Sequence, residues 1–140
     1  MAEESTTPGV DELIRRIVDA WNRRDIEAVM SFFAPDGVWD MTPMGMGTSR
    51  GGSAIRQFCA EWWGAYDEYQ IEAEEIVELG NGVAFAVTVQ NARLAGSKGL
   101  VQARYAAVST WRDGLLERVT NYTNIPEARA AAERLAEERR

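Results

Sequence analysis

Histidine is absent from the 140-residue sequence, and cysteine occurs once, at Cys59. The absence of histidine excludes Ser-His-Asp and Cys-His catalysis and histidine metal ligation. A single cysteine can form neither an intrachain disulfide nor a thiolate zinc cluster, and it fits a reducing cytoplasmic compartment. The sequence also contains no glycine-rich phosphate loop and no calcium-loop pattern, so we expect neither a metal nor a cofactor.

Long apolar runs and a surplus of basic residues are missing as well. No apolar run approaches the ~20 residues of a membrane span, and the first residues, MAEESTTPGV, lack the features of a signal peptide. Acidic residues outnumber basic ones by 22 to 15, which gives a net charge of −7. Because this charge repels phosphate backbones and anionic lipid, we expect no nucleic-acid partner and no membrane partner.

The residues that are present have the composition of one ordinary globular domain, with 46% hydrophobic and 26% charged residues. Residues 1–9 are polar and contain Pro8-Gly9, which predicts a disordered tail. Residues 10–140 are then expected to form a single domain.

Hydrophobic spacing and capping residues predict four helices. Apolar residues repeat at helical spacing from Asp11 to Trp21. Asp25 suits the N-cap of a second helix, Ser53 that of a third, and Asn124 that of a last one.

Period-two alternation predicts strands over 38–41, 69–79, 83–94, 100–111 and 115–123. The alternation slips near 75–77, where we expect a bulge, and the glycine-rich segment 42–52 is expected to be a loop. Short turns join the last four strands, which is typical of antiparallel hairpins. The order therefore predicts an α+β fold with helices packed on one face of an antiparallel sheet.

Several segments resemble nuclear transport factor 2-like domains. The opening of such a domain is similar to WNRRDIE (21–27) and FAPDGVWDM (33–41), and its closing strands are similar to WRDG (111–114) and NYTN (121–124). The SnoaL-like branch, named for polyketide cyclases, is the most similar, over about residues 10–135. The resemblance implies a curved antiparallel sheet wrapped around helices, an apolar cavity open at one end, and often a homodimer formed through the outer sheet face.

The acid and base residues of ketosteroid isomerases, one enzyme type of this family, have no counterpart here. The resemblance places Ile17 at the position of their tyrosine, Met41 at the aspartate base and Ala107 near the second acid. None of these side chains can donate or accept a proton.

The epoxide hydrolases and polyketide cyclases of the family also use residues that this chain lacks. In the epoxide hydrolases the water-holding tyrosine and asparagine match Trp39 and Met41, and the arginine and aspartate of the relay fall near Thr88 and Gln90. The last-strand aspartate falls at Asn121, an amide that cannot act as a base. The late acidic residue of the cyclases falls at Asn121 or Asn124.

Asp40 is the one carboxylate next to the expected pocket strand. We consider it a candidate general base, with Tyr105 and Asn121 binding a carbonyl oxygen as the other catalytic residues. In the alternative, strand alternation turns Trp39 and Met41 inward and Asp40 outward, where it pairs with an arginine or a loop amide.

Strand parity also predicts the residues that contact a ligand. Small alanines beside Tyr105 leave space that favours a cavity over a filled core, and of two adjacent tryptophans on the third helix only one can face fully inward. The expected ligand-binding set is Trp39, Met41, Trp63, Thr88, Gln90, Ala103, Ala107 and Thr123.

Two functions stay open at this point. The first is a cofactor-free cyclase, isomerase or hydrolase that acts on a small apolar carbonyl or polyketide-like molecule. The second is a ligand-binding or accessory protein that has kept the pocket and lost the base.

Overall fold

The structure is a computed structural model that describes residues 9–139. The helices are α1 (Val10–Asn22), α2 (Ile26–Ser31), η1 (Thr42–Met44, a 3-10 turn), α3 (Gly51–Gly64) and α4 (Ile125–Glu138). The strands are β1 (Phe33–Asp40), β2 (Thr48–Arg50), β3 (Tyr66–Gly80), β4 (Val83–Leu94), β5 (Val101–Arg112) and β6 (Leu115–Tyr122). The predicted tail, apart from Gly9, lies outside the described residues.

Side-chain caps fix the starts of two helices where the sequence predicts them. The Asp25 carboxylate accepts a hydrogen bond from the Ala28 backbone N–H at 3.1 Å, and the Asn124 side chain accepts one from Glu127 N–H at 2.9 Å. The prediction for α3 is wrong by three residues, because the N-cap is Arg50 and not Ser53, and the helix begins at Gly51. Gly51 has a φ of +81°, which glycine adopts without strain and which lets the chain turn directly from β2 into α3.

The six strands form one curved sheet in the order β2-β1-β6-β5-β4-β3. The predicted α+β class is confirmed, with one difference: β1 and β6 pair in parallel, while all other neighbours pair antiparallel. Hairpin turns show only how consecutive strands pair. The pairing of β1 with β6 joins segments about 80 residues apart in the chain (Trp39 lies opposite Val119), so the turns gave no information about it.

The segment 42–52 is more regular than the predicted loop, because it contains η1 and β2. β2 pairs antiparallel with the end of β1, with Asp40 opposite Thr48. The predicted bulge is present slightly earlier in β3, where the register shifts between Ala73 and Glu75. Such shifts increase the local bend of a strand and help the long sheet to curve.

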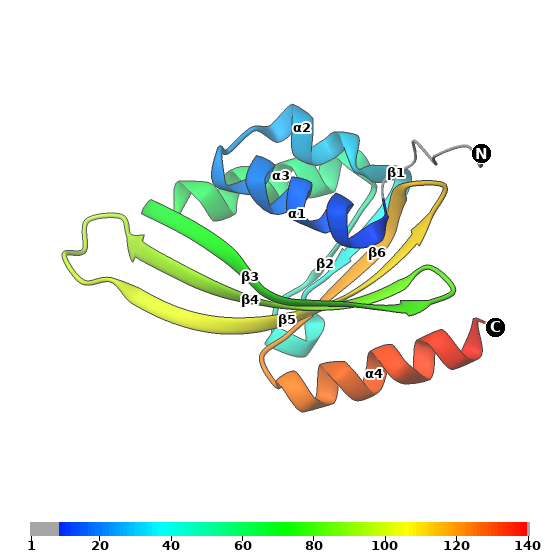
Figure 1. Ribbon diagram of the computed structural model, residues 1–140. Helices are drawn as coiled ribbons and strands as arrows, with labels where there is room; N and C mark the ends of the chain where they lie inside the picture. The colour runs from blue at the N-terminus through cyan, green and yellow to red at the C-terminus, as the bar shows by residue number, and fades with distance from the viewer. Residues whose placement is uncertain (1–8, 140) are drawn as a thin grey trace, which may run out of the picture.

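The helices lie on both faces of the sheet, which corrects the prediction that they pack on one face only. α1, α2 and α3 cover the concave face, and α4 runs along the opposite face (Figure 1). α4 presents Ala128, Ala132 and Ala136 at helical spacing, and these buried residues pack against Phe85 and Val108 of the sheet. The small alanines allow a close approach of helix and sheet, so part of the outer face is covered by the chain itself.

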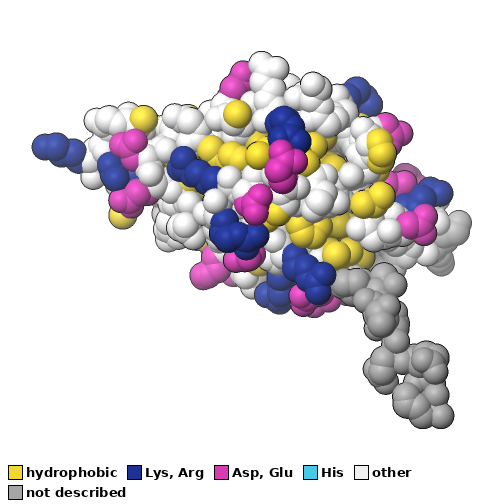
Figure 2. Space-filling model, turned by 90° about the horizontal axis from the view of Figure 1, so that it is seen from above, with side chains coloured by type: hydrophobic (Ala, Val, Ile, Leu, Met, Phe, Trp, Pro, Cys, Tyr) yellow, Lys and Arg dark blue, Asp and Glu magenta, His cyan; other side chains and the backbone are white. Residues whose placement is uncertain are grey.

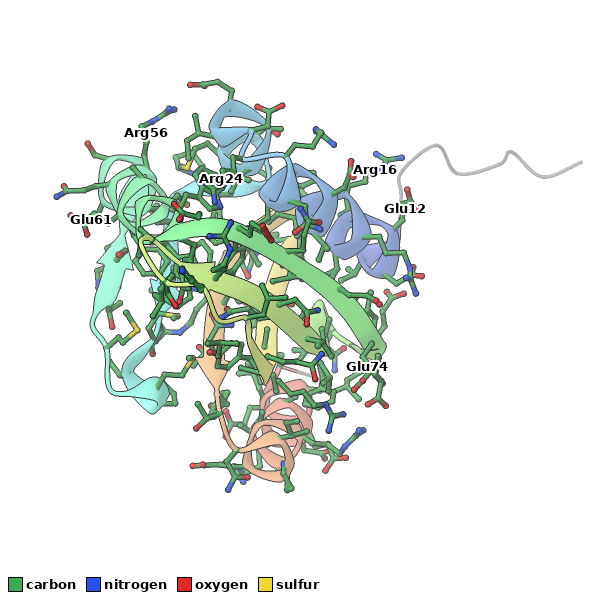
Figure 3. All side chains as sticks on the ribbon, turned by 90° about the vertical axis from the view of Figure 1, so that its left-hand side faces the viewer. Glu12, Arg16, Arg24, Arg56, Glu61 and Glu74 are labelled. Carbon is green, nitrogen blue, oxygen red and sulfur yellow. The ribbon has the colours of Figure 1, made fainter. Side chains whose placement is uncertain are left out.

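Charged side chains surround the helix-covered face, whose centre shows hydrophobic side chains (Figure 2). Glu12 and Arg16 lie side by side on α1 and point away from the sheet, joined by a hydrogen bond of 3.0 Å (Figure 3). In the described part of the chain, no helix is long and apolar enough to cross a membrane.

Candidate functional site

A cavity of about 150 Å³ lies between the concave face of the sheet and the helices α1, α2 and α3. Its wall is mostly apolar and aromatic. The sheet contributes from β1 and from β3 to β6, and the helical side includes Ile14, Ile17, Val18, Trp21, Val29, Phe58 and Trp62. An apolar cavity of this volume is large enough to hold a molecule of about one aromatic ring.

Most of the residues that strand parity turns inward line this cavity. They are Trp39, Met41, Thr88, Gln90, Tyr105, Ala107 and Asn121. The register explains their convergence: Tyr105 of β5 lies opposite Thr88 of β4, and Ala107 lies opposite Asn121 of β6. Side chains at paired positions of an antiparallel sheet point to the same face.

Trp63 is not a lining residue, and Trp62 takes the place that the sequence analysis gave to it. Trp63 continues the most buried stripe of α3, which also contains Ile55 and Cys59 at four-residue spacing. Its ring packs against Trp21, with centroids 4.8 Å apart, and fills the core. Trp62 lies one residue back, in line with Phe58, on the side of the helix that faces the cavity.

Ala103 and Thr123 also lie outside the lining of this cavity. Ala103 is on the part of β5 near the β4–β5 hairpin, which extends beyond the helices that close the cavity (Figure 1). Thr123 is exposed and follows the last residue of β6. Strand alternation predicts which face of the sheet a side chain is on. It does not predict which part of the strand the helices cover.

Asp40 points to the face of the sheet opposite to the cavity. Its carboxylate accepts hydrogen bonds from Thr42 N–H at 2.9 Å and from the hydroxyls of Thr42 and Thr48 at 2.6 and 3.2 Å. Arg118 Nη2 of β6 donates a further bond at 2.5 Å. Of the two arrangements considered from the sequence, the structure has the outward one, and Asp40 does not contact the cavity.

The environment of Asp40 stabilises its charged form. Burial raises the pKa of this carboxyl, but the hydrogen bonds from Thr42 and the ion pair with Arg118 outweigh burial and hold the pKa below its ordinary value. A general base that works near neutral pH needs a pKa tuned in the other direction. The geometry instead makes Asp40 a clamp that joins β1, η1, β2 and β6.

Three polar side chains of the cavity, Gln90, Asn121 and Ser109, each accept a hydrogen bond from an aromatic side chain. Tyr69 Oη donates to Gln90 Oε1 at 2.8 Å, and Trp39 Nε1 donates to Asn121 Oδ1 at 2.6 Å. Trp111 Nε1 donates to Ser109 Oγ at 2.9 Å. The acceptor atoms of both amides are therefore already in use by the protein itself.

Tyr69 and Tyr105 are the only titratable side chains among the described residues that line the cavity. Burial raises the pKa of Tyr69 to about 12 and also raises the pKa of Tyr105. The indole nitrogens of Trp62 and Trp21 approach the Tyr69 hydroxyl and lower its pKa, against the larger effect of burial. Neither indole N–H, however, reaches a partner in hydrogen-bond geometry within the described part of the chain. Both phenols stay protonated at neutral pH and can act only as hydrogen-bonding groups.

Sequence reasoning missed several lining residues, above all Trp21, Tyr69 and Met44. Trp21 ends the apolar stripe of α1, and Tyr69 has the same inward parity along β3 as Ile71, so both signals were present in the sequence. Met44 lies in η1, where no periodicity indicates direction.

No group of three or more potential metal ligands occurs within residues 9–139. Cys59 is buried in the core, and burial raises the pKa of its thiol to about 12, so it is inert as a nucleophile.

Solved structures with the same fold cover nearly the whole chain. TerC, co-crystallised with polyporic acid, is 22% identical with a TM-score of 0.72, over 89% of this chain and 97% of that one. A ketosteroid isomerase-like protein from Catenulispora acidiphila, in complex with trimethylamine, is 18% identical with a TM-score of 0.74, over 91% and 94%. An LEH-like epoxide hydrolase from M. tuberculosis is 15% identical with a TM-score of 0.68, over 88% of each chain.

These likenesses establish the nuclear transport factor 2-like fold. No curated protein matches the sequence. The model of the SnoaL-like domain matches residues 14–119, which include most of α1, all of α2 and α3, and nearly the whole sheet. The chain belongs to the SnoaL-like family of ligand-binding pocket proteins.

Proposed function

We propose that the protein binds a small apolar carbonyl or polyketide-like molecule in the concave cavity, without a cofactor and without acid–base catalysis. The observation that carries this proposal is the lining itself: among the described residues, no carboxylate, lysine, arginine or thiol faces the cavity. The remaining polar groups are amides, hydroxyls and indoles, which orient a ligand but cannot remove a proton from it.

An enzyme of the cyclase, isomerase or hydrolase type would need a base at the ligand. Asp40 was the candidate, and its carboxylate is engaged by Thr42, Thr48 and Arg118 on the other side of the sheet. Tyr105 and Asn121 do line the cavity, and in this proposal they contact the carbonyl oxygen of a bound ligand rather than assist a reaction. The polyporic acid in the TerC crystal supports a cyclic oxygenated ligand.

Titration with acetophenone, a one-ring aromatic ketone, followed by tryptophan fluorescence, tests the proposal, because Trp21, Trp39, Trp62 and Trp111 line the cavity. We expect saturable quenching that Ala107→Leu weakens, since the larger side chain occupies ligand space. Ala95→Leu, the same change at an exposed turn residue, serves as the control and should bind normally. Equal quenching of both variants would place binding elsewhere and contradict the proposal.

We further propose that the protein is a cytoplasmic homodimer, as the family resemblance implies. Since α4 covers part of the outer sheet face, a second copy would have to use the rest of that face. A stable interface needs at least ~1,000 Å². Sedimentation velocity at micromolar concentration tests this, and a monomer there would contradict it.

A further inference from the structure

The two amides of the cavity differ from freely rotating amides, because each has its oxygen held by an aromatic donor. Gln90 is 2% exposed, and its Oε1 accepts from Tyr69. Asn121 Oδ1 accepts from the Trp39 indole. An amide whose oxygen is fixed in this way presents its NH₂ group, with two donor hydrogens, to whatever else lies beside it. Neither NH₂ group has an acceptor among the residues that the structure describes.

Ser109 and two tryptophans of the wall add to this pattern. Ser109 Oγ is occupied as an acceptor by Trp111, and the indole N–H groups of Trp21 and Trp62 are unpartnered. The described residues of the cavity therefore present several donors without a partner, beside the hydroxyls of Thr88 and Tyr105, which can both donate and accept, and none of them is charged. A buried donor without a partner is unfavourable by about 1–3 kcal/mol. A bound molecule with acceptor oxygens would therefore be stabilised by hydrogen bonds from these donors.

The two amides lie at different ends of the sheet's inner surface. Gln90 of β4 and Asn121 of β6 lie on the two sides of β5. Gln90 is paired with Ala103 of β5, and Asn121 is paired with Ala107. Four residues along a strand and two strand spacings across it separate the two backbones by about 16 Å. The two side chains and two hydrogen bonds of about 2.9 Å each take up part of this span, which leaves room for one para-substituted ring.

We propose that the cavity selects a planar molecule with an acceptor oxygen at each end, held by the NH₂ groups of Gln90 and Asn121. In this arrangement Tyr69 and Trp39 are positioning residues, because they fix which half of each amide faces the ligand. The inference rests on the proposed binding function and adds the chemical class of its ligand: an aromatic or quinone-like dicarbonyl rather than a hydrocarbon, an alcohol or an amine.

An isosteric series of three probes tests the selection by counting oxygens. Para-diacetylbenzene has two carbonyls, para-ethylacetophenone has one, and para-diethylbenzene has none. We expect affinity, measured by isothermal titration calorimetry, to fall by about threefold to tenfold at each step, which is the net effect of one hydrogen bond. Equal affinity for all three probes would overturn the inference while leaving the proposed binding function intact.

Substitutions then assign each oxygen to one amide. Gln90→Met and Asn121→Leu remove one donor group each while keeping a similar volume, so each should reduce one affinity step of the series, and the double variant should reduce both steps. Gln102→Met and Asn91→Leu make the same changes on the outer face of β5 and β4, where the two residues bond to each other, and should keep both steps. If the double variant shows the same affinity differences between the three probes as the unaltered protein, the inference is overturned.

Tyr69→Phe tests the positioning role separately. It keeps the amide but removes the hydroxyl that fixes it, so the ratio of the affinity for diacetylbenzene to the affinity for diethylbenzene should decrease. An unchanged preference would show that Tyr69 does not orient Gln90. If none of the three probes binds to the unaltered protein, the proposed function itself fails, which is a different outcome from binding without dependence on oxygen.

Discussion

The Asp40 clamp gives the sharpest prediction about stability, because its role differs from that of a catalytic carboxylate. Four hydrogen bonds converge on the carboxylate, one of them charge-assisted from Arg118, and the side chain of Asp40 is only 12% exposed. In Asp40→Asn the amide oxygen can still accept from Thr42 and Thr48. The amide nitrogen, however, would then face the guanidinium of Arg118, donor against donor.

The expected loss is one charge-assisted hydrogen bond, which contributes about 1.5–3 kcal/mol when both partners are buried. Arg118 is 41% exposed, so water replaces part of the interaction in the variant. We therefore expect the free energy of unfolding to decrease by about 1–2 kcal/mol, measured by urea denaturation at neutral pH. Because the cavity is on the other face, ligand affinity should not change.

The pH dependence of this loss provides an independent check. The pKa of Asp40 is lower in the folded protein than in the unfolded chain, where it is about 3.9. The stabilisation is therefore fully present above about pH 4 and is lost as the pH falls through the folded pKa. The difference in free energy of unfolding between the parent protein and Asp40→Asn should be constant near neutral pH and should decrease in acid.

Two results would refute the clamp. One is an Asp40→Asn variant that is as stable as the parent protein at neutral pH. The other is a difference in free energy of unfolding that does not decrease in acid. Arg118→Met in a double-mutant cycle with Asp40→Asn isolates the pair, and a coupling energy near zero would assign the effect to the threonines instead. If Asp40→Asn is as stable as the parent protein but no longer binds the ligand, Asp40 takes part in the binding site.

Three further predictions concern the cavity, the core cysteine and α4. Ligand affinity should be nearly constant between about pH 6 and pH 8, because the two tyrosines of the lining have raised pKa values, and a calorimetric titration with a steep slope in that range would reveal an ionisable group at the ligand. Cys59, whose thiol pKa is raised to about 12, should react with Ellman's reagent only after unfolding, so rapid labelling of the native protein would contradict its burial. Ala132→Glu would place a charge against the sheet and should lower the melting temperature by several degrees, whereas Ala130→Glu, at a less buried position of the same helix, should change it little.

The sequence contained enough information for the fold class and for most of the sheet's inner face. Period-two alternation identifies β4, β5 and β6 almost residue by residue, because these strands are long and bounded by tight glycine turns. Local patterns do not determine which distant strands become neighbours, and so the parallel pairing of β1 with β6 could not be predicted. The position of α4 was open to prediction, since its alanine stripe marks a helix that must pack closely on something.

The site was harder to predict, for reasons that particular residues illustrate. Trp62 and Trp63 differ by one position on a helix, a rotation of about 100°, and both are large and apolar, so hydrophobicity alone cannot choose between them. The deciding factor is the line that Trp63 forms with Ile55 and Cys59 toward the core. Ala103 and Thr123 have the inward parity but lie outside the cavity lining. Tertiary packing, and not strand alternation, determines where along the strands the cavity ends.

The relation between Trp39 and Asp40 shows how the fold separates stability from binding along a single strand. Successive residues of β1 point to opposite faces, so the indole of Trp39 holds Asn121 inside the cavity while the carboxylate of Asp40 holds Arg118 outside it. Both partners belong to β6, at positions 121 and 118, and the parallel pairing that the sequence did not reveal is what brings them beside β1. The same register therefore sets the orientation of the Asn121 amide and anchors the strand that carries it. The binding group is on the inner face, and the charge that stabilises it is kept away from the ligand.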